Sequence, residues 1–179
     1  MIKVQSNIKG ESPLMMDRLD VDDIINPKRQ PRKYTEEVLQ AMGEKAIYRN
    51  EHGLYFPSRN VKKCLIEGAR TGRMNLKGTQ RLAPFIEALV GVQPQEILFG
   101  KNEPDDYIQF PMRTKRGDVI PKRLPIMKDW ELTFTLLIFD DQIVDRVNEA
   151  LVFAGFSVGL GNQRPEYGRF EVVEWKIIK

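Results

Sequence analysis

A strand, a helix and a second strand follow one another in the C-terminal part of the chain, and this succession limits the possible folds. Residues 130–139 alternate large apolar with mainly polar side chains, which is the two-residue period of a β-strand. Apolar residues then recur at helical spacing over 143–154, with Asp140 or Asp141 as the predicted N-cap and Gly155 as the predicted left-handed stop. Residues 170–178 form the last predicted strand. The pattern indicates an α+β fold.

The N-terminal part adds one strand and three helices. Residues 1–8 alternate as a strand that Gly10 and Pro13 end. A helix is predicted from Thr35, as N-cap, to about Arg49. A second helix is predicted from Ser58, as N-cap, to Gly72, and a third carries apolar residues over 82–90 with Pro84 in its first turn. Residues 107–114 are predicted to be a strand.

The element order is therefore strand, helical region, strand, strand, helix, strand. This is the ferredoxin-like (RRM-like) β-α-β-β-α-β plan, an antiparallel sheet with a multi-helix insertion after the first strand. We predict a single domain over 1–179, with the helical insertion at about 17–92 and a basic loop or hairpin at about 113–128. Helices on one face of such a sheet leave the other face free to bind a ligand.

Composition excludes several functional classes. The chain has 179 residues with one cysteine, Cys64, and one histidine, His52, so an internal disulfide framework, a multi-cysteine zinc site and a histidine-rich metal cluster are excluded. No apolar run approaches the length of a membrane span, and the N-terminus lacks the apolar region of a signal peptide. We expect a soluble cytoplasmic protein that needs no cofactor or metal and has no membrane partner.

Charge is segregated along the chain although the net charge is only +3. Residues 59–81 carry seven basic side chains against Glu67, and residues 113–128 carry six against Asp118. Acidic residues gather elsewhere, at 17–23, 96–106 and 140–149. This distribution is consistent with a basic face that binds phosphates, although charge runs also commonly serve only to solvate a surface.

The connection between the last helix and the last strand is rich in glycine and arginine. Glycines at 155, 159, 161 and 168 permit positive φ and close approach of a backbone, and Arg164 and Arg169 add positive charge. Such a loop could cradle a phosphodiester. It could equally be a tight αβ connection whose glycines only fit the turn.

The segment 159–170 has the form Gly-x-Gly-x-x-Arg-Pro-x-Tyr-Gly-Arg-Phe and resembles the signature of the RAMP superfamily of CRISPR effector proteins. Residues 10–16, Gly-Glu-Ser-Pro-Leu-Met-Met, resemble the matching segment of the backbone subunits of those complexes. The resemblance implies RNA binding by the loop and the sheet face, and head-to-tail assembly along a guide strand. The chain is shorter than typical backbone subunits, which favours a small phage-encoded or stand-alone relative in a bacterial or archaeal cell.

We therefore predict a non-catalytic protein that binds single-stranded nucleic acid, RNA rather than DNA, with a homo-oligomer or CRISPR-type complex subunits as further partners. Contacts to the nucleic-acid backbone should dominate, with little sequence preference. The predicted binding residues are Gly159, Gly161, Asn162, Gln163, Arg164, Tyr167, Gly168, Arg169, Arg113, Lys115, Arg116, Lys122 and Arg123.

Two other functions stay open from the residues alone. A viral decoy that mimics a CRISPR subunit would act through protein contacts, as an anti-CRISPR protein. A RAMP-like endoribonuclease would need His52 as general acid or base beside Tyr48 and Tyr55, although a lone histidine in a turn is usually only exposed. The aspartates at 17–23 could hold magnesium, but solvation and helix capping explain them equally well.

Overall fold

The centre of the molecule is a four-stranded antiparallel sheet in the order β12-β1-β11-β7. The structure is a computed structural model, and it describes residues 1–19, 25, 31, 33–113 and 117–178. The four strands are β1 (Ile2–Gly10), β7 (Val90–Gln93), β11 (Glu131–Ile138) and β12 (Phe170–Ile178). The first strand lies between the last and the third, as in the ferredoxin-like plan, and the predicted α+β fold is confirmed.

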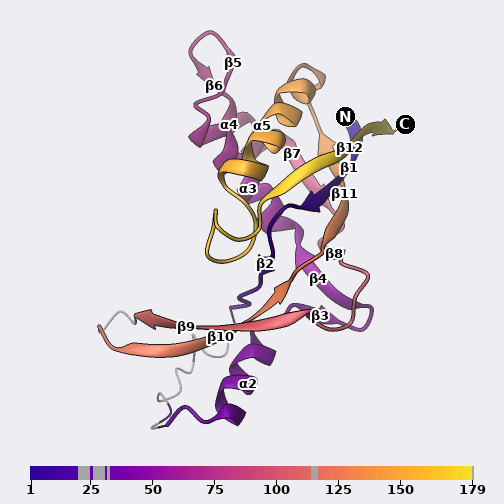
Figure 1. The fold of residues 1–179 in the computed structure, drawn as a ribbon. Coiled ribbons are helices and arrows are strands. Elements are labelled where there is room, and N and C mark those ends of the chain that lie inside the picture. Colours follow the sequence, from indigo (N-terminus) through magenta and orange to yellow (C-terminus); the bar gives the residue numbers. More distant parts are fainter. Residues whose placement is uncertain (20–24, 26–30, 32, 114–116, 179) are drawn as a thin grey trace.

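Two helices, α3 (Ser58–Thr71) and α5 (Val144–Ser157), cover one face of this sheet (Figure 1). They approach each other closely at Gly68, because a Cβ there would lie 2.6 Å from the Cβ of Ala154. The strands bury the predicted apolar face: Val4 and Ile8 of β1, and Leu132 and Leu136 of β11, have no exposed surface. The two-residue period of residues 130–139 therefore predicted correctly which side chains form the core.

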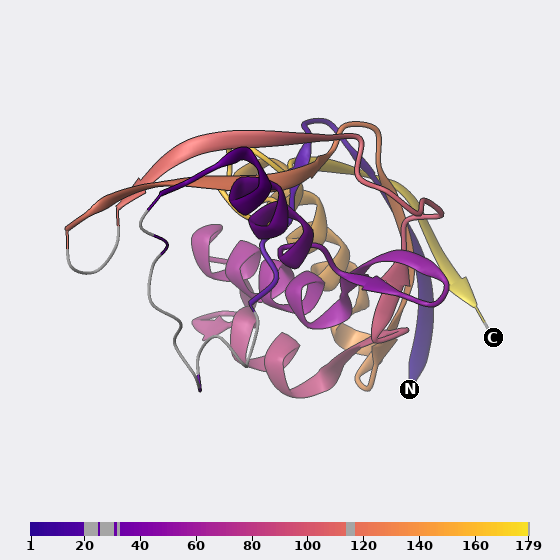
Figure 2. The same ribbon diagram turned by 90° about the horizontal axis from the view of Figure 1, so that it is seen from below.

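A long hairpin forms a second layer. Its strands β9 (Asp106–Arg113) and β10 (Val119–Met127) pair antiparallel, and β2 (Leu14–Met15) adds to β10. Helix α2 (Glu36–Lys45) packs on β10, and Figures 1 and 2 show the hairpin crossing the molecule with α2 against it. A small hydrophobic cluster separate from the main core lies there and comprises Met15, Ala46, Leu124 and Ile126, with Ile108, Phe110 and Tyr167 packed against it.

Short elements complete the described part of the chain. They are β3 (Arg49–Asn50), β4 (Gly53–Pro57), β5 (Asn75–Lys77), β6 (Gln80–Arg81), α4 (Leu82–Leu89), β8 (Glu96–Leu98) and the 3₁₀ turn η1 (Asp141–Ile143). Asp140 caps η1 by accepting a hydrogen bond from the Gln142 N–H (3.0 Å), as predicted. No helix within the described ranges combines the length and the hydrophobicity needed to cross a bilayer.

The second strand of the central sheet differs from the sequence prediction. Residues 107–113 do form a strand, but it belongs to the hairpin, and β7 takes the second position beside β11. Strand β7 is only four residues long and follows α4 directly, so it continues the apolar run of that helix without a turn signal. The boundaries of the predicted domain and of its insertion stay predictions.

Three predicted helix boundaries were also wrong. Helix α2 ends at Lys45, and Arg49, its predicted end, lies in β3. Ser58 is the first residue of α3, and Pro57 stands at the N-cap without a capping side chain. Gly155 lies inside α5, and the left-handed residue after that helix is Gly159 (φ 73°). The glycine at 155 has a packing role: a Cβ there would lie 2.1 Å from the carbonyl oxygen of Phe170.

Replacing Gly155 with alanine should therefore destabilise the protein. Helix propensity alone favours alanine by roughly 1 kcal/mol. The overlap with the Phe170 carbonyl should cost about 1–3 kcal/mol or more, because backbone of α5 or β12 must shift. Urea unfolding measures the difference, and Gly91→Ala is the control, since its Cβ would meet Leu137 at 3.5 Å, an ordinary contact. Greater stability of Gly155→Ala would contradict the close approach.

Candidate nucleic-acid interface

The glycine-rich loop between α5 and β12 is held against the segment that follows β1. The N–H of Gly168 donates to the carbonyl of Pro13 (2.9 Å), and the N–H of Asn162 donates to the carbonyl of Met15 (2.9 Å). The Ser12 hydroxyl accepts from the N–H of Arg169 (3.0 Å). The structure thus brings together the two segments on which the family resemblance depends, although they are far apart in sequence.

The loop glycines make this contact possible. A Cβ on Gly168 would lie 1.8 Å from the carbonyl oxygen of Leu160, and one on Gly161 would lie 2.3 Å from that of Met15. Both residues also have positive φ, at 76° and 78°. A side chain is therefore excluded at both positions by backbone conformation and by space.

Most backbone N–H groups of the loop are already hydrogen-bonded within the protein. Gly159 donates to Ala154, Leu160 to Gly168, and Tyr167 to Gln163. Gln163, which has a φ of 55°, donates to the side chain of Asn162. The N–H groups of Gly159 and Gly168 are therefore engaged within the protein, and phosphate binding by the backbone over 159–168 stays a prediction.

The loop arginines remain accessible. Both Arg164 and Arg169 are exposed, and neither forms an ion pair with a carboxylate in the described part of the chain. The Nε of Arg169 donates to the carbonyl of Pro165 (2.9 Å), which fixes the side chain and leaves its charge uncompensated. These two guanidinium groups are the strongest phosphate donors that the loop offers.

Asp17 joins the loop to the base of the hairpin. Its Oδ2 accepts from the Nζ of Lys122 (2.6 Å) and from the Nδ2 of Asn162 (2.7 Å). All three side chains are partly buried, which strengthens the electrostatic attraction between them. From the sequence, Lys122 was predicted only to contact nucleic acid. The ion pair with Asp17 gives it a structural role as well.

Arg123 is similarly engaged, with helix α2. Its guanidinium pairs with Glu36 and lies over the ring of Tyr107 at 5.4 Å from the centroid. The Tyr107 hydroxyl donates to Glu44 (2.5 Å), and burial together with this carboxylate raises the pKa of Tyr107. These contacts attach α2 to the hairpin.

The other predicted residues divide into three groups. Arg113 is exposed at the end of β9 without an ion pair to any described residue, so it can contact a ligand. Lys115 and Arg116 lie outside the described residues. Tyr167 packs against the small cluster between the hairpin and α2, so part of its ring is not available for stacking.

A cavity of about 520 Å³ lies on the side of the loop that faces α3. Glu67 and Thr71 of α3 form one wall, and residues 157–158 and 161–165 form the other, including Arg164. Four of the predicted residues therefore border one open space, namely Gly161, Asn162, Gln163 and Arg164. The space is large enough for a nucleic-acid strand to pass beside Arg164.

The free face of the sheet, for which the family resemblance implies RNA binding, carries mainly polar and charged side chains. The register places Lys3, Gln5, Asn7 and Lys9 of β1 on this face, beside Glu131, Thr133, Thr135, Leu137, Glu171, Glu174, Lys176 and Ile178 of the neighbouring strands. These positions include three lysines and three glutamates, so their charges balance, and they include no aromatic residue. RNA-recognition modules stack bases on aromatic side chains of such a face.

A basic cavity at the far end of α3 was missed in the sequence. Arg70, Arg73 and Arg81 line a space of about 320 Å³ with Ala69, Met74, Ala83 and Pro84. Arg73 has a φ of 50°, and its carbonyl accepts a hydrogen bond from Arg81 (3.2 Å). The excess of basic residues over 59–81 was the available signal, but it did not reveal that these three converge.

Residues considered for other chemistry lie in ordinary environments. The side chain of His52 is 68% exposed in the turn between β3 and β4, where its Nε2 is 3.3 Å from Glu51. Of the aspartates at 17–23, Asp20, Asp22 and Asp23 lie outside the described residues. Burial raises the pKa of the Cys64 thiol to about 12, and its Sγ donates to the carbonyl of Gly159 (3.2 Å). The described residues contain no cluster of three potential metal ligands.

Comparison with solved structures identifies a related architecture. The chain matches a chain in "Cryo-EM structure of the Type III-B Cmr-beta bound to cognate target RNA", with a TM-score of 0.61 and 12% sequence identity. The two share a fold. The match covers 99% of this chain but 61% of the other, so this chain spans less than two thirds of that protein's length.

A second solved structure, Cmr6 from Pyrococcus furiosus, matches with a TM-score of 0.49 and 11% identity over 96% of this chain and 98% of that one. No protein-family model matches the sequence. No curated protein matches it either.

Replacing Asp17 with alanine should loosen the contact between loop and hairpin. The change leaves the Lys122 ammonium and the Asn162 amide without their shared acceptor, which should cost about 1–2 kcal/mol. Hydrogen exchange of residues 159–168 should accelerate, and urea unfolding should report the loss of stability. Glu166→Ala, an exposed carboxylate change in the same loop, is the control and should leave both quantities unchanged. Equal exchange in the two variants would contradict the bridging role of Asp17.

Proposed function

We propose that the chain is a non-catalytic RAMP-type subunit that binds single-stranded RNA through the glycine-rich loop. Its fold, shared with a chain of an RNA-bound Type III-B Cmr-beta structure, supports this proposal. The observation that carries it is the pair of exposed arginines, Arg164 and Arg169, on a loop whose backbone is fixed by hydrogen bonds to residues 12–15. A fixed backbone presents the two charges at a constant spacing, which lowers the entropic cost of binding a phosphodiester chain.

The phosphate contacts in this proposal come from side chains. Arg164 borders the cavity between the loop and α3, and Arg169 stands at the entry to β12. Arg113, with Lys115 and Arg116 beyond the described residues, extends the basic track to the hairpin. Lys122 and Arg123 support this track indirectly, by fixing the hairpin against Asp17 and Glu36.

Several copies of the chain assemble along one strand in this proposal. Segregated acidic and basic segments favour head-to-tail contacts, in which a basic surface of one copy meets an acidic surface of the next. Purified protein should then carry RNA, with a raised ratio of absorbance at 260 to 280 nm, and should become smaller on sizing after ribonuclease treatment. A monomer free of nucleic acid would favour the protein-decoy alternative.

The double variant Arg164→Ala with Arg169→Ala should weaken the binding of single-stranded RNA. Loss of two phosphate contacts should lower affinity by about 10- to 100-fold and reduce the slope of log Kobs against log salt concentration by about 1.4. Fluorescence anisotropy with a labelled oligonucleotide at several salt concentrations measures both.

Arg146→Ala with Lys176→Ala removes the same charge from α5 and from the sheet face and is the matched control. It should leave the salt slope near that of the parent protein. The same slope in all three proteins would exclude the loop from the interface.

A further inference from the structure

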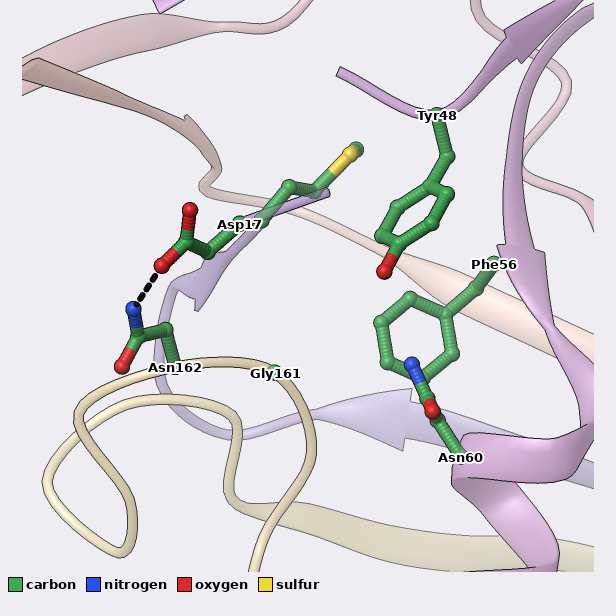
Figure 3. Close-up of a pocket in the computed structure, with 7 residues that line it drawn as sticks. Asp17, Tyr48, Phe56, Asn60, Gly161 and Asn162 are labelled. Carbon is green, nitrogen blue, oxygen red and sulfur yellow. Dashed lines mark hydrogen bonds between the residues drawn. The ribbon is translucent and has the colours of Figure 1, made fainter. Parts of the chain in front are cut away.

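A second cavity, of about 250 Å³, lies between the loop and β4 and is lined by Met16, Asp17, Tyr48, Phe56, Asn60, Gly161 and Asn162. It shares Gly161 and Asn162 with the cavity on the α3 side of the loop. Figure 3 shows the side chains of Tyr48, Phe56 and Asn60 facing Asp17 and Asn162 across this space. The loop thus borders a cavity on each side.

The hydroxyl of Tyr48 has no hydrogen-bond partner among the residues that the structure describes. The residue is only 8% exposed, and its hydroxyl points into the cavity (Figure 3). The side-chain amide of Asn60, at the start of α3, is likewise without a partner there. Neither group is fully enclosed, so both are accessible from the cavity and can donate to and accept from a ligand placed there.

The other polar groups of the cavity are already satisfied. Asp17 Oδ2 accepts from Lys122 and from Asn162, and the Asn162 Oδ1 accepts from the N–H of Gln163. Lys122 is therefore neutralised, and no basic side chain among the described residues lines this cavity. A phosphate would find no counter-charge here, so the chemistry favours an uncharged ligand.

The walls favour a flat apolar ligand with polar edges. Met16 and Phe56 are buried and form the apolar part of the lining. A tyrosine hydroxyl and an asparagine amide can each donate and accept, and nucleobases present adjacent donors and acceptors along their edges. Asparagine amides pair in this way with adenine in nucleic-acid complexes.

We propose that this cavity binds one unstacked nucleobase of the strand whose phosphates lie on the loop. The inference rests on the proposed function, and it adds a base-reading position to an interface otherwise built on phosphates. Tyr48 and Asn60 hydrogen-bond the edge of the base. Asp17 and Asn162 act as positioning residues that hold the loop wall of the cavity in place.

Nucleosides test the cavity separately from the phosphate sites, because they carry no phosphate. Saturation-transfer NMR with adenosine, uridine and cytidine should give base-proton signals with the parent protein, with free ribose as the reference. Tyr48→Phe, which removes only the hydroxyl, should lower the affinity for the nucleoside by about 3- to 10-fold, and Asn60→Ala should lower it by a similar factor. Tyr55→Phe is the matched control, since Tyr55 stacks near Tyr48 (5.7 Å between centroids) but lies outside the cavity lining.

Homopolymers of adenylate, uridylate and cytidylate of one length test the same site in a strand. The parent protein should distinguish them by about threefold or more, and Tyr48→Phe should remove that difference without changing affinity for the weakest homopolymer. Arg164→Ala with Arg169→Ala should lower the affinity for all three and leave the nucleoside signals unchanged.

These outcomes separate the two proposals. Nucleoside signals no stronger than those of ribose, or unchanged in both Tyr48→Phe and Asn60→Ala, would overturn the base site while leaving strand binding intact. Nucleoside binding in a protein that binds no strand would instead overturn the proposed function and retain the base site. Circular dichroism of each variant confirms that the fold is preserved.

Discussion

The contact between the glycine-rich loop and the segment after β1 is the constraint on which the interface depends. Two backbone hydrogen bonds, from Gly168 to Pro13 and from Asn162 to Met15, join the two ends of the chain at this point. They require that Gly161 and Gly168 lack side chains, because carbonyl oxygens occupy the space. The conformation of the loop, the direction of its arginines and the two cavities beside it all follow from this approach of backbone to backbone.

The fold could largely be predicted from periodicity. The alternation over 130–139 predicted that strand and its buried face, and the strand at 170–178 was also predicted. The order of strands and helices predicted the ferredoxin-like plan. The exception was β7, whose four residues follow α4 without a break. Such a short strand forms because it pairs with β11, which is distant in sequence, and the local residue pattern does not show this pairing.

The position of the binding site on this loop stays a prediction, and the structure shows contacts of the loop that its sequence did not reveal. The sequence shows which residues the loop contains, and not that Gly159 and Gly168 use their N–H groups internally. Nor does it show that Lys122 pairs with Asp17, which is 105 positions away in the sequence. It also does not show that Tyr48 and Asn60 line a cavity beside the loop. Each of these facts depends on tertiary contacts, which composition and residue spacing do not reveal.

Internal pairing of Lys122 and Arg123 has a consequence for how strongly one copy can bind. Because Asp17 and Glu36 neutralise these cations, Lys122 and Arg123 add little to the attraction between one copy and an RNA strand. A single protomer should therefore dissociate quickly, whereas neighbours on one strand hold it by avidity, since each bound copy raises the effective concentration of the next. The fraction of RNA that is bound would then rise sharply above a certain RNA length. Short RNA fragments would stay unbound, and long ones would be covered by many copies of the protein.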